Sequence, residues 1–330
     1  MTVLITGGAG YIGAHIVRLL NDAGRRVVVV DDLSTGSASR IPNVPHERLD
    51  LSEPGSAGPL AAILAAHAVT SVVHLAAKKR VDESVRRPAW YVQQNLGGLA
   101  TVLQAMQAAE VDRLVYSSSA AVYGNTSAAE VTEDALLAPV NPYGETKLAG
   151  EWFVRDAARA WGLRAASLRY FNVAGAGWPE LGDPLVLNLV TMLLQSRERG
   201  QRPKVFGADY PTPDGSCVRD FVHVLDLARA HIASLDYLTR PVREFDVFNV
   251  GTGTGSSVLE VTRELARVTD WDAEPELCPR RAGDPASVVA SVDRITRVMG
   301  WRARAALPEI LASAWAAWQV DHPRLHAARG

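Results

Sequence analysis

The chain has 330 residues, of which 48% are hydrophobic and 21% charged, and its formal net charge is −2 at pH 7. This length can bury a large core and suits one large domain with a smaller lobe. The near-neutral charge without a basic block argues against nucleic acid as a partner, and no apolar run approaches the length of a membrane span.

The cysteines and histidines show no metal-binding pattern. Cys217 and Cys278 make neither a disulfide framework nor a zinc motif, and the eight histidines lack metal-ligand spacing, so we expect no metal. A strand-forming run begins at residue 2 with no basic segment or cleavage site before it. Since two cysteines also suit a reducing compartment, the expected location is the cytoplasm.

The first elements predict a dinucleotide-binding unit. An apolar, β-branched run over residues 2–6 is typical of a buried strand, and a glycine-rich loop over residues 7–13 follows it. An amphipathic helix then reaches Gly24, and a second strand over residues 26–30 ends on Asp31 and Asp32.

The chemistry of this unit favours NAD. Glycines let the backbone turn sharply and approach a pyrophosphate, and the helix N-terminus offers amide groups and a partial positive charge. Asp31 lies eighteen residues beyond Gly13, where its carboxylate can accept hydrogen bonds from the adenosine ribose. The same charge would repel a 2'-phosphate, which favours NAD over NADP.

The following elements continue the alternation of strands and helices. Strands are predicted over residues 71–75, 113–116 and 163–171, and long helices over 89–109 and from Pro142 to Trp161. This pattern indicates an α/β fold with a doubly wound parallel sheet, a Rossmann domain. We expect it over residues 1–172, with 218–250 returning to it. Residues 173–330 would otherwise form a smaller α/β lobe.

Tyr143 and Lys147 form a candidate proton-transfer pair. Four residues apart on the helix, they lie on one face. A free tyrosine has a pKa of about 10, so acting as a base near pH 7 needs about 4 kcal/mol of stabilisation of the phenolate. Lys147 supplies one cation, and an oxidised nicotinamide ring would supply a second.

The motifs together resemble the extended short-chain dehydrogenase/reductase family and, within it, the UDP-glucose 4-epimerases. The resemblance rests on the glycine loop, residues 117–124 (SSSAAVYG), Tyr143 with Lys147, and three later segments: residues 170–172 (YFN), 206–224 and 279–284. It covers nearly the whole chain. It implies an NAD-dependent isomerase of UDP-hexoses that works through a 4-keto sugar, and it implies a homodimer built on the helices that begin at Ala89 and Tyr143.

The resemblance also implies roles for individual residues. Ser119 would join Tyr143 and Lys147 as the catalytic set. The implied cofactor-binding residues are Gly7, Gly10, Tyr11, Ile12, Gly13, Asp31, Asp32, Asp50, Leu51, Leu75, Ala76, Ala77, Lys79, Asn95, Ser117, Tyr143, Lys147 and Tyr170. The implied substrate-binding residues are Ser119, Tyr143, Asn172, Asn188, Leu189, Phe206, Arg219, Phe221, Arg281, Asp284 and Val288. Planar arginines such as Arg219 and Arg281 suit a diphosphate.

Two departures from the family pattern concern the sugar pocket. Ser287 and Val288 stand where enzymes restricted to glucose and galactose carry a bulky tyrosine, so N-acetylated UDP-hexoses are further candidate substrates. The loop over residues 177–183 is also shorter than in typical members.

Alternative functions remain open at this point. A UDP-glucuronate or UDP-pentose 4-epimerase or decarboxylase would use the positive charge of Lys78, Lys79 and Arg80. A 4,6-dehydratase would need an Asp-Glu pair where this chain has Ala120 and Ala121. A non-enzymatic NAD-sensing protein would not require the intact catalytic set.

Overall fold

The computed structural model describes residues 1–126, 130–281 and 283–323. A seven-stranded sheet with all neighbours parallel forms its centre, in the order β10-β6-β5-β4-β1-β2-β3. These strands are β1 (Thr2–Thr6), β2 (Arg26–Asp31), β3 (His46–Arg48), β4 (Val69–His74), β5 (Arg113–Ser119), β6 (Arg164–Tyr170) and β10 (Phe245–Val250). The predicted α/β fold class is confirmed.

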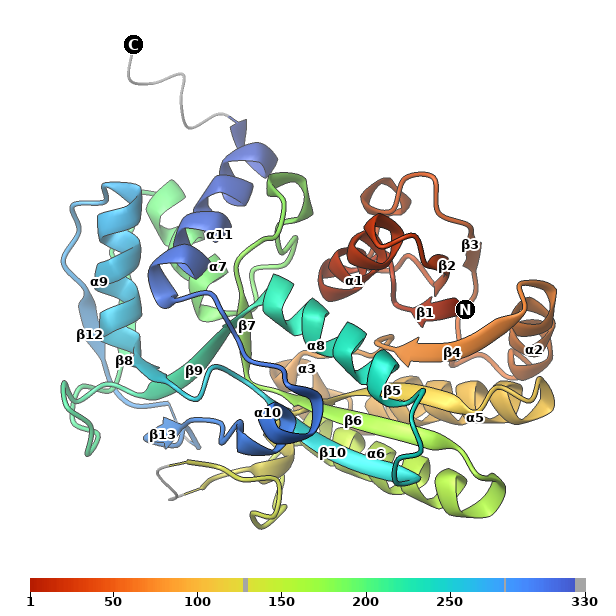
Figure 1. Cartoon of the computed structure of the whole chain (residues 1–330). Helices are drawn as coiled ribbons and strands as arrows, with labels where there is room; N and C mark the ends of the chain where they lie inside the picture. Colours follow the sequence, from red (N-terminus) through yellow and green to blue (C-terminus); the bar gives the residue numbers. More distant parts are fainter. Residues whose placement is uncertain (127–129, 282, 324–330) are drawn as a thin grey trace.

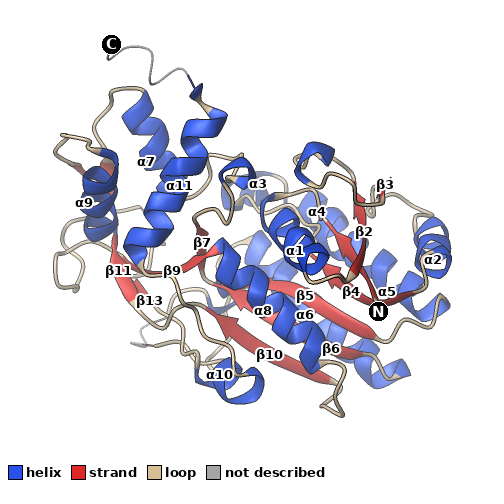
Figure 2. Cartoon of the chain, turned by 45° about the horizontal axis from the view of Figure 1, so that its top comes forward, coloured by secondary structure: helices blue, strands red, loops and turns tan. Residues whose placement is uncertain are grey.

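Helices cover both faces of this sheet (Figures 1 and 2). Helices α1 (Tyr11–Asp22), α8 (Val224–Tyr237) and α10 (Asp293–Met299) pack on one face. Helices α2 (Ala57–Ala66), α5 (Gly98–Ala108) and α6 (Pro142–Trp161) pack on the other. Because side chains alternate along a strand, Val3 and Ile5 of β1 enter the first core and Leu4 enters the second. Burial on both faces explains the nearly continuous apolar strands.

Short helices connect these layers. They are α3 (Val81–Arg86), α4 (Pro88–Tyr91) and the 3-10 turns Ala38–Arg40, Ala120–Tyr123 and Pro179–Leu181. The predicted helix over 89–109 is present as α4, a π-helical segment (Val92–Gly97) and α5. A π-helical turn within a helix often accompanies a functional site.

The smaller lobe has its own sheet and core. Strands β7 (Asn172–Ala174), β11 (Gly255–Ser257) and β13 (Ser287–Val288) all pair with β9 (Val218–His223). Strands β8 (Lys204–Phe206) and β12 (Glu276–Cys278) pair separately. Helices α7 (Leu189–Glu198), α9 (Val258–Thr269) and α11 (Leu307–Asp321) surround an apolar cluster that includes Val190, Phe221 and Leu311, and Figure 1 shows them together on the left.

Residues 218–250, which we expect to return to the larger domain, divide between the two parts. Helix α8 packs against α1, and β10 extends the large sheet beside β6. Strand β9 instead pairs within the sheet of the smaller lobe. An apolar pattern predicts a buried strand but does not say which sheet it joins, so the domain boundaries stay a prediction.

Candidate active site

The glycine loop packs too closely for side chains at two of its positions. Gly7 has φ of +70°, and a Cβ there would lie 2.8 Å from the backbone nitrogen of Ala76. A Cβ on Gly13 would overlap the carbonyl oxygen of Gly7. This close packing brings the N-terminus of α1, with its unpaired amide groups, to the carboxyl end of β1.

Asp31 ties this loop to the end of β2. Its Oδ2 accepts a hydrogen bond from the backbone N–H of Ala9 at 3.0 Å, and its Oδ1 accepts one from Leu33 at 2.9 Å. Burial raises the pKa of Asp31, and these two backbone hydrogen bonds oppose the rise. A carboxylate has about four acceptor positions, so two positions remain for ribose hydroxyls.

A cavity of about 560 Å³ lies against the loop and along the carboxyl ends of the sheet. Among the residues that line it are Gly7, Gly10, Tyr11, Ile12, Gly13, Asp31, Asp32, Asp50, Leu51, Leu75, Ala76, Ala77, Lys79, Ser117, Tyr143, Lys147 and Tyr170. These are the predicted cofactor-binding residues with the exception of Asn95. The crevice at the carboxyl ends of the strands is where ligands of this fold class bind.

Asn95 lies behind the cavity wall, within the π-helical segment. Its side chain accepts a hydrogen bond from the backbone N–H of Lys78 at 2.8 Å and donates one to the carbonyl of Lys78 at 3.1 Å. It also donates to Thr146 Oγ1 at 3.0 Å. Asn95 therefore holds the segment after β4 against the helix that carries Tyr143 and Lys147.

The cavity has further lining residues that are not among the predicted cofactor-binding residues. Lys78 is one: its Nζ lies 3.3 Å from Asp32 Oδ2 and donates to Ser34 Oγ at 2.9 Å. The others are Val30, Ser34, Thr35, Gly36, Leu49, Ser52, Arg80, Glu83, Trp90, Gln94, Gly98, Asp183, Pro184, Leu185, Val186 and Leu187. The run of lysines after β4 was a signal for Lys78, whereas nothing local marks residues 183–187 as part of a cofactor pocket.

Tyr143 and Lys147 project from α6 into the cavity, as predicted. The helix begins with Asn141 as its N-cap, whose Oδ1 accepts from the Gly144 N–H at 2.9 Å, and with Pro142 in the first turn. Lys147 donates from Nζ to the carbonyl of Ser117 at 2.7 Å, and the same Nζ lies 6.0 Å from the centre of the Tyr143 ring. The spacing of four residues does bring the two groups to one face.

Two glycines allow α6 to approach β5 and the 3-10 turn after it closely. A Cβ on Gly144 would lie 2.7 Å from the carbonyl oxygen of Ala121, and one on Gly150 would overlap the hydroxyl of Tyr116. They lie on either side of Lys147 along the helix. The active-site face of α6 is thus pressed against the strand that carries Ser117 and Ser119.

Burial in a site with little water disfavours the charged form of each side chain in this pair, and the pKa values of both shift accordingly. Burial lowers the pKa of Lys147 to about 7, and the negative charge of Glu151 opposes this. Burial raises the pKa of Tyr143, and hydrogen bonding with Ser119 lowers it. Ser119 also accepts from the Ala121 N–H at 3.2 Å. The protein without cofactor therefore does not by itself favour the phenolate.

The predicted substrate-binding residues of the smaller lobe form two pairs. Arg219 lies 3.8 Å from the carboxylate of Asp284 and donates to the carbonyls of Val218 and Pro285 at 2.9 Å each. The guanidinium of Arg281 stacks on the ring of Phe206 at 3.8 Å. Both pairs combine an arginine with a group predicted to contact the nucleoside.

The other predicted substrate-binding residues are more scattered. Asn172 on β7 pairs in register with Phe221 on β9, and Phe221 is buried in the core of the lobe. Asn188 caps α7, with its Oδ1 accepting from the Thr191 N–H at 3.0 Å, and Leu189 is the first residue of that helix. Val288 pairs in register with Arg219.

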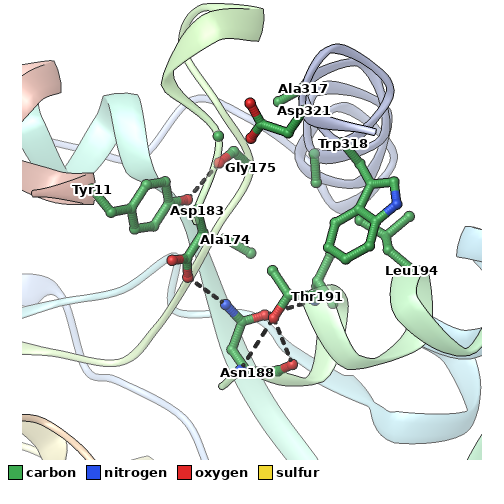
Figure 3. Close-up of a pocket in the computed structure, with 13 residues that line it drawn as sticks. Tyr11, Ala174, Gly175, Asp183, Asn188, Thr191, Leu194, Ala317, Trp318 and Asp321 are labelled. Carbon is green, nitrogen blue, oxygen red and sulfur yellow. Dashed lines mark hydrogen bonds between the residues drawn. The ribbon is translucent and has the colours of Figure 1, made fainter. Parts of the chain in front are cut away.

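The loop between β7 and α7 connects the cofactor side to the lobe (Figure 3). At one end the hydroxyl of Tyr11 donates to the carbonyl of Gly175, and at the other Asn188 donates to Asp183 Oδ2 at 2.9 Å. Between these points Trp178 packs near His15, and Arg18 forms an ion pair with Glu180. The segment that lines the cavity is therefore anchored on both parts of the molecule.

The described residues contain neither a cluster of metal ligands nor a membrane-spanning helix. No group of three or more His, Cys, Asp or Glu side chains among them could hold a metal ion. Within the same ranges, no helix is long and apolar enough to cross a membrane.

A Rossmann cavity whose wall carries a Tyr-Lys pair defines a class: an enzyme that uses a nicotinamide dinucleotide for hydride transfer. A profile of the NAD dependent epimerase/dehydratase family matches residues 3–251, and the chain belongs to that family. Both the predicted family and NAD as the predicted cofactor are confirmed.

Similar proteins agree along nearly the whole chain. The UDP-glucose 4-epimerase of Azospirillum brasilense is 44% identical over 305 residues, which cover 91% of this chain and 86% of that protein. A solved UDP-glucose 4-epimerase from Stenotrophomonas maltophila, with bound NAD and formylated UDP-arabinopyranose, is 38% identical with a TM-score of 0.92 and covers 97% of this chain and 98% of its own. The enzyme from Bifidobacterium longum, in complex with NAD+ and UDP, is 32% identical with a TM-score of 0.88 and covers 98% and 99%.

Proposed function

We propose that the protein is a UDP-hexose 4-epimerase that interconverts UDP-glucose and UDP-galactose through a 4-keto sugar. One observation carries this: Tyr143 and Lys147 line the same cavity as the glycine loop and Asp31. This arrangement supports a base that acts beside a hydride acceptor. Relatives named UDP-glucose 4-epimerase, 37–44% identical over nearly the full chain, support the choice of reaction.

The residues of the cavity fit NAD. Glycines with no room for a Cβ form the loop, and Asp31 keeps free acceptor positions for ribose hydroxyls. Asp31, Asp50 and the loop would hold the adenosine and pyrophosphate, and Lys147 and Tyr170 would lie at the nicotinamide half. When bound, NAD supplies reversible hydride acceptance, so that C4 can be oxidised and reduced again within one turnover.

The protein's own groups handle the proton. Tyr143, as phenolate, accepts the proton of the sugar 4-hydroxyl, and Ser119 orients or relays it. Lys147, as ammonium, favours the phenolate over the neutral phenol. Oxidation removes the stereocentre, so a keto sugar that turns about its link to the diphosphate accepts the hydride on its other face. Tyr143 then returns the proton to the oxygen at C4.

The smaller lobe anchors the nucleotide in this scheme. Arg219 and Arg281 bind the diphosphate, Asp284 the uridine ribose, and Phe206 packs on the uracil. Asn172 and Asn188 contribute hydrogen bonds to sugar or phosphate oxygens. Charged side chains bind the diphosphate, whereas few side chains contact the hexose. The keto sugar is therefore free to turn.

N-acetylated UDP-hexoses fit as additional substrates. Val288 packs partly buried against a cluster that includes Val122 and Phe171, close to the turn that follows Ser119. A valine there leaves more space than a tyrosine. We expect turnover of UDP-N-acetylglucosamine, and we expect Val288→Tyr to abolish it while leaving UDP-glucose turnover within about threefold. Equal loss with both sugars would contradict this role.

The protein also carries a surface suited to a homodimer. Val81, Val85, Val92, Trp152 and Phe153 are exposed apolar side chains on α3, the π-helical segment and α6. Helix α6 packs against both of the other elements, so these residues belong to neighbouring helices. Such a face suits a second copy of this chain. Sedimentation should show a dimer, and Trp152→Glu with Phe153→Glu should yield monomers.

The reaction is tested by NMR on the purified protein without added cofactor. UDP-galactose should give UDP-glucose with no net formation of NADH. UDP-glucuronate and UDP-pentoses in parallel samples distinguish the related epimerases and decarboxylases. No turnover of any UDP-sugar by protein that contains NAD would instead indicate a sensing role.

A further inference from the structure

A buried ion pair joins helix α6, which carries Tyr143 and Lys147, to strand β6 of the sheet. Glu151 of α6 and Arg169 of β6 are each only 3% exposed. Arg169 donates to the two carboxylate oxygens of Glu151 at 2.9 and 2.7 Å, and Ser118 Oγ also donates to Glu151. Arg169 further donates to the hydroxyl of Tyr123 at 2.8 Å. Since apolar residues of similar size often serve stability as well as a buried pair does, stability alone is a weak reason for it.

The ion pair lies one helical turn along α6 from the active-site lysine. Glu151 follows Lys147 by one helical turn, on the same face of α6. Consecutive residues of β5 contact the two groups: the carbonyl of Ser117 accepts from Lys147, and the hydroxyl of Ser118 donates to Glu151. These contacts therefore fix the Glu151 carboxylate about one helical turn from the Lys147 ammonium group.

The other titratable groups that face Lys147 carry no negative charge near neutral pH. Burial and the charge of Lys147 hold the pKa of His74, on β4, at about 3, so its ring stays neutral. The phenol ring of Tyr116, on β5, lies 5.4 Å from Nζ, and burial raises its pKa well above the usual value. Tyr170, on β6, lines the same cavity, and burial raises its pKa too. Glu151 is the group whose negative charge opposes the effect of burial on the pKa of Lys147.

We propose that Glu151, held by Arg169 and Ser118, is a positioning residue whose carboxylate keeps Lys147 in its ammonium form and so sets the pH at which Tyr143 acts as a base. This inference rests on the proposed function. Without the negative charge, Lys147 would be neutral over more of the range near pH 7. The Tyr143 phenolate would then lose its nearest cation and form only at higher pH.

The decisive comparison is between Glu151→Gln and Glu151→Asp in the NAD-loaded enzyme. Glutamine keeps the shape and loses the charge, whereas aspartate keeps the charge and loses a methylene. We expect Glu151→Gln to move the acidic limb of the kcat/KM profile upward by about one pH unit, a loss of about tenfold at pH values well below the limb. Glu151→Asp should leave the limb where it is in the native enzyme, even if its Tm falls.

A second readout does not depend on turnover. The ultraviolet difference spectrum between each protein and its Tyr143→Phe counterpart follows ionisation of Tyr143 without any sugar present. It should shift by the same amount as the kcat/KM profile. If the UDP-hexose reaction is absent, this titration still tests Glu151, so failure of the proposed function and failure of this inference are distinguishable.

Two further variants separate electrostatics from packing. Ser118→Ala removes a neutral hydrogen bond to Glu151 and should leave the pH profile unchanged. Glu151→Gln combined with Arg169→Met removes both charges and avoids leaving Arg169 unpaired, so it provides a folded protein if the single variant does not fold. An unchanged Tyr143 titration in the folded Gln variants, or a larger shift in Glu151→Asp than in Glu151→Gln, overturns the proposal.

Discussion

The two sides of the proposed active site are built by different means. The cofactor side is built of backbone packed so closely that a Cβ on Gly7 or Gly13 would meet other backbone atoms. On the proposed nucleotide side, arginine side chains contact groups of their own lobe: Arg219 lies 3.8 Å from Asp284, and Arg281 stacks on Phe206. In the proposed reaction the cofactor stays bound and the substrate leaves at every turnover, and this difference in construction suits both.

The largest effect is expected at the cofactor side, from Tyr143→Phe. Loss of the proton acceptor should lower kcat about a thousandfold, within the usual range for general acid–base catalysis. Bound NAD should remain, because the loop and Asp31 are untouched. Assays of epimerisation together with NAD content check this, and near-normal kcat would refute the assigned role.

Gly13→Ala should disrupt the cofactor side through its backbone. The new methyl would overlap the carbonyl of Gly7, which cannot move without opening the loop. We expect about a hundredfold weaker NAD binding, or about 3 kcal/mol, by calorimetry on the apo-protein. The control is Gly58→Ala, at an exposed position of α2 where a Cβ meets nothing within 4 Å. That change should leave binding intact and raise stability slightly.

Acid should destabilise the larger domain through buried histidines. Burial lowers the pKa of His231 and of His15 to about 4 each. Between pH 6.5 and 4 the unfolded chain binds protons that the folded chain does not, so stability falls as pH falls through that window. For His231 alone the loss at pH 5 is about 2 kcal/mol.

Urea unfolding at pH 7 and pH 5 measures this contribution. His231→Gln keeps a hydrogen-bonding group and should reduce the difference in unfolding free energy between the two pH values. His46→Gln, at an exposed position, should change it little. An equal dependence in all three proteins would show that His231 does not contribute.

The smallest effect is expected on the nucleotide side. Arg281→Ala should raise the KM for UDP-galactose about tenfold, since one of two proposed diphosphate partners remains. Its neighbour is a matched control: Arg280 is exposed, stacks on Tyr210 and pairs with Asp209. Arg280→Ala should leave KM unchanged. If both variants behave alike, surface charge and not a specific contact is responsible.

Much of the fold, and many of the residues that line the cavity, followed from local patterns. The strand, glycine loop, helix and second strand appear where predicted, because backbone conformation, capping and apolar periodicity act over short distances. The positions of Tyr143 and Lys147 followed for the same reason, since four residues make about one turn of a helix. Asn95 was placed near the site, but its role in joining Lys78 to Thr146 needed the structure.

What the sequence by itself determined is the class of chemistry: the residues predicted to bind a dinucleotide and the pair predicted to move a proton lie in short, self-contained motifs. Only the tertiary structure decided which distant residues complete the site. It placed β9 in the smaller sheet, residues 183–187 on the wall of the cofactor cavity, and Glu151 against Arg169 beneath Lys147. Such contacts join residues that are far apart in the sequence. Local periodicity predicts single helices and strands but not which distant segments pack together.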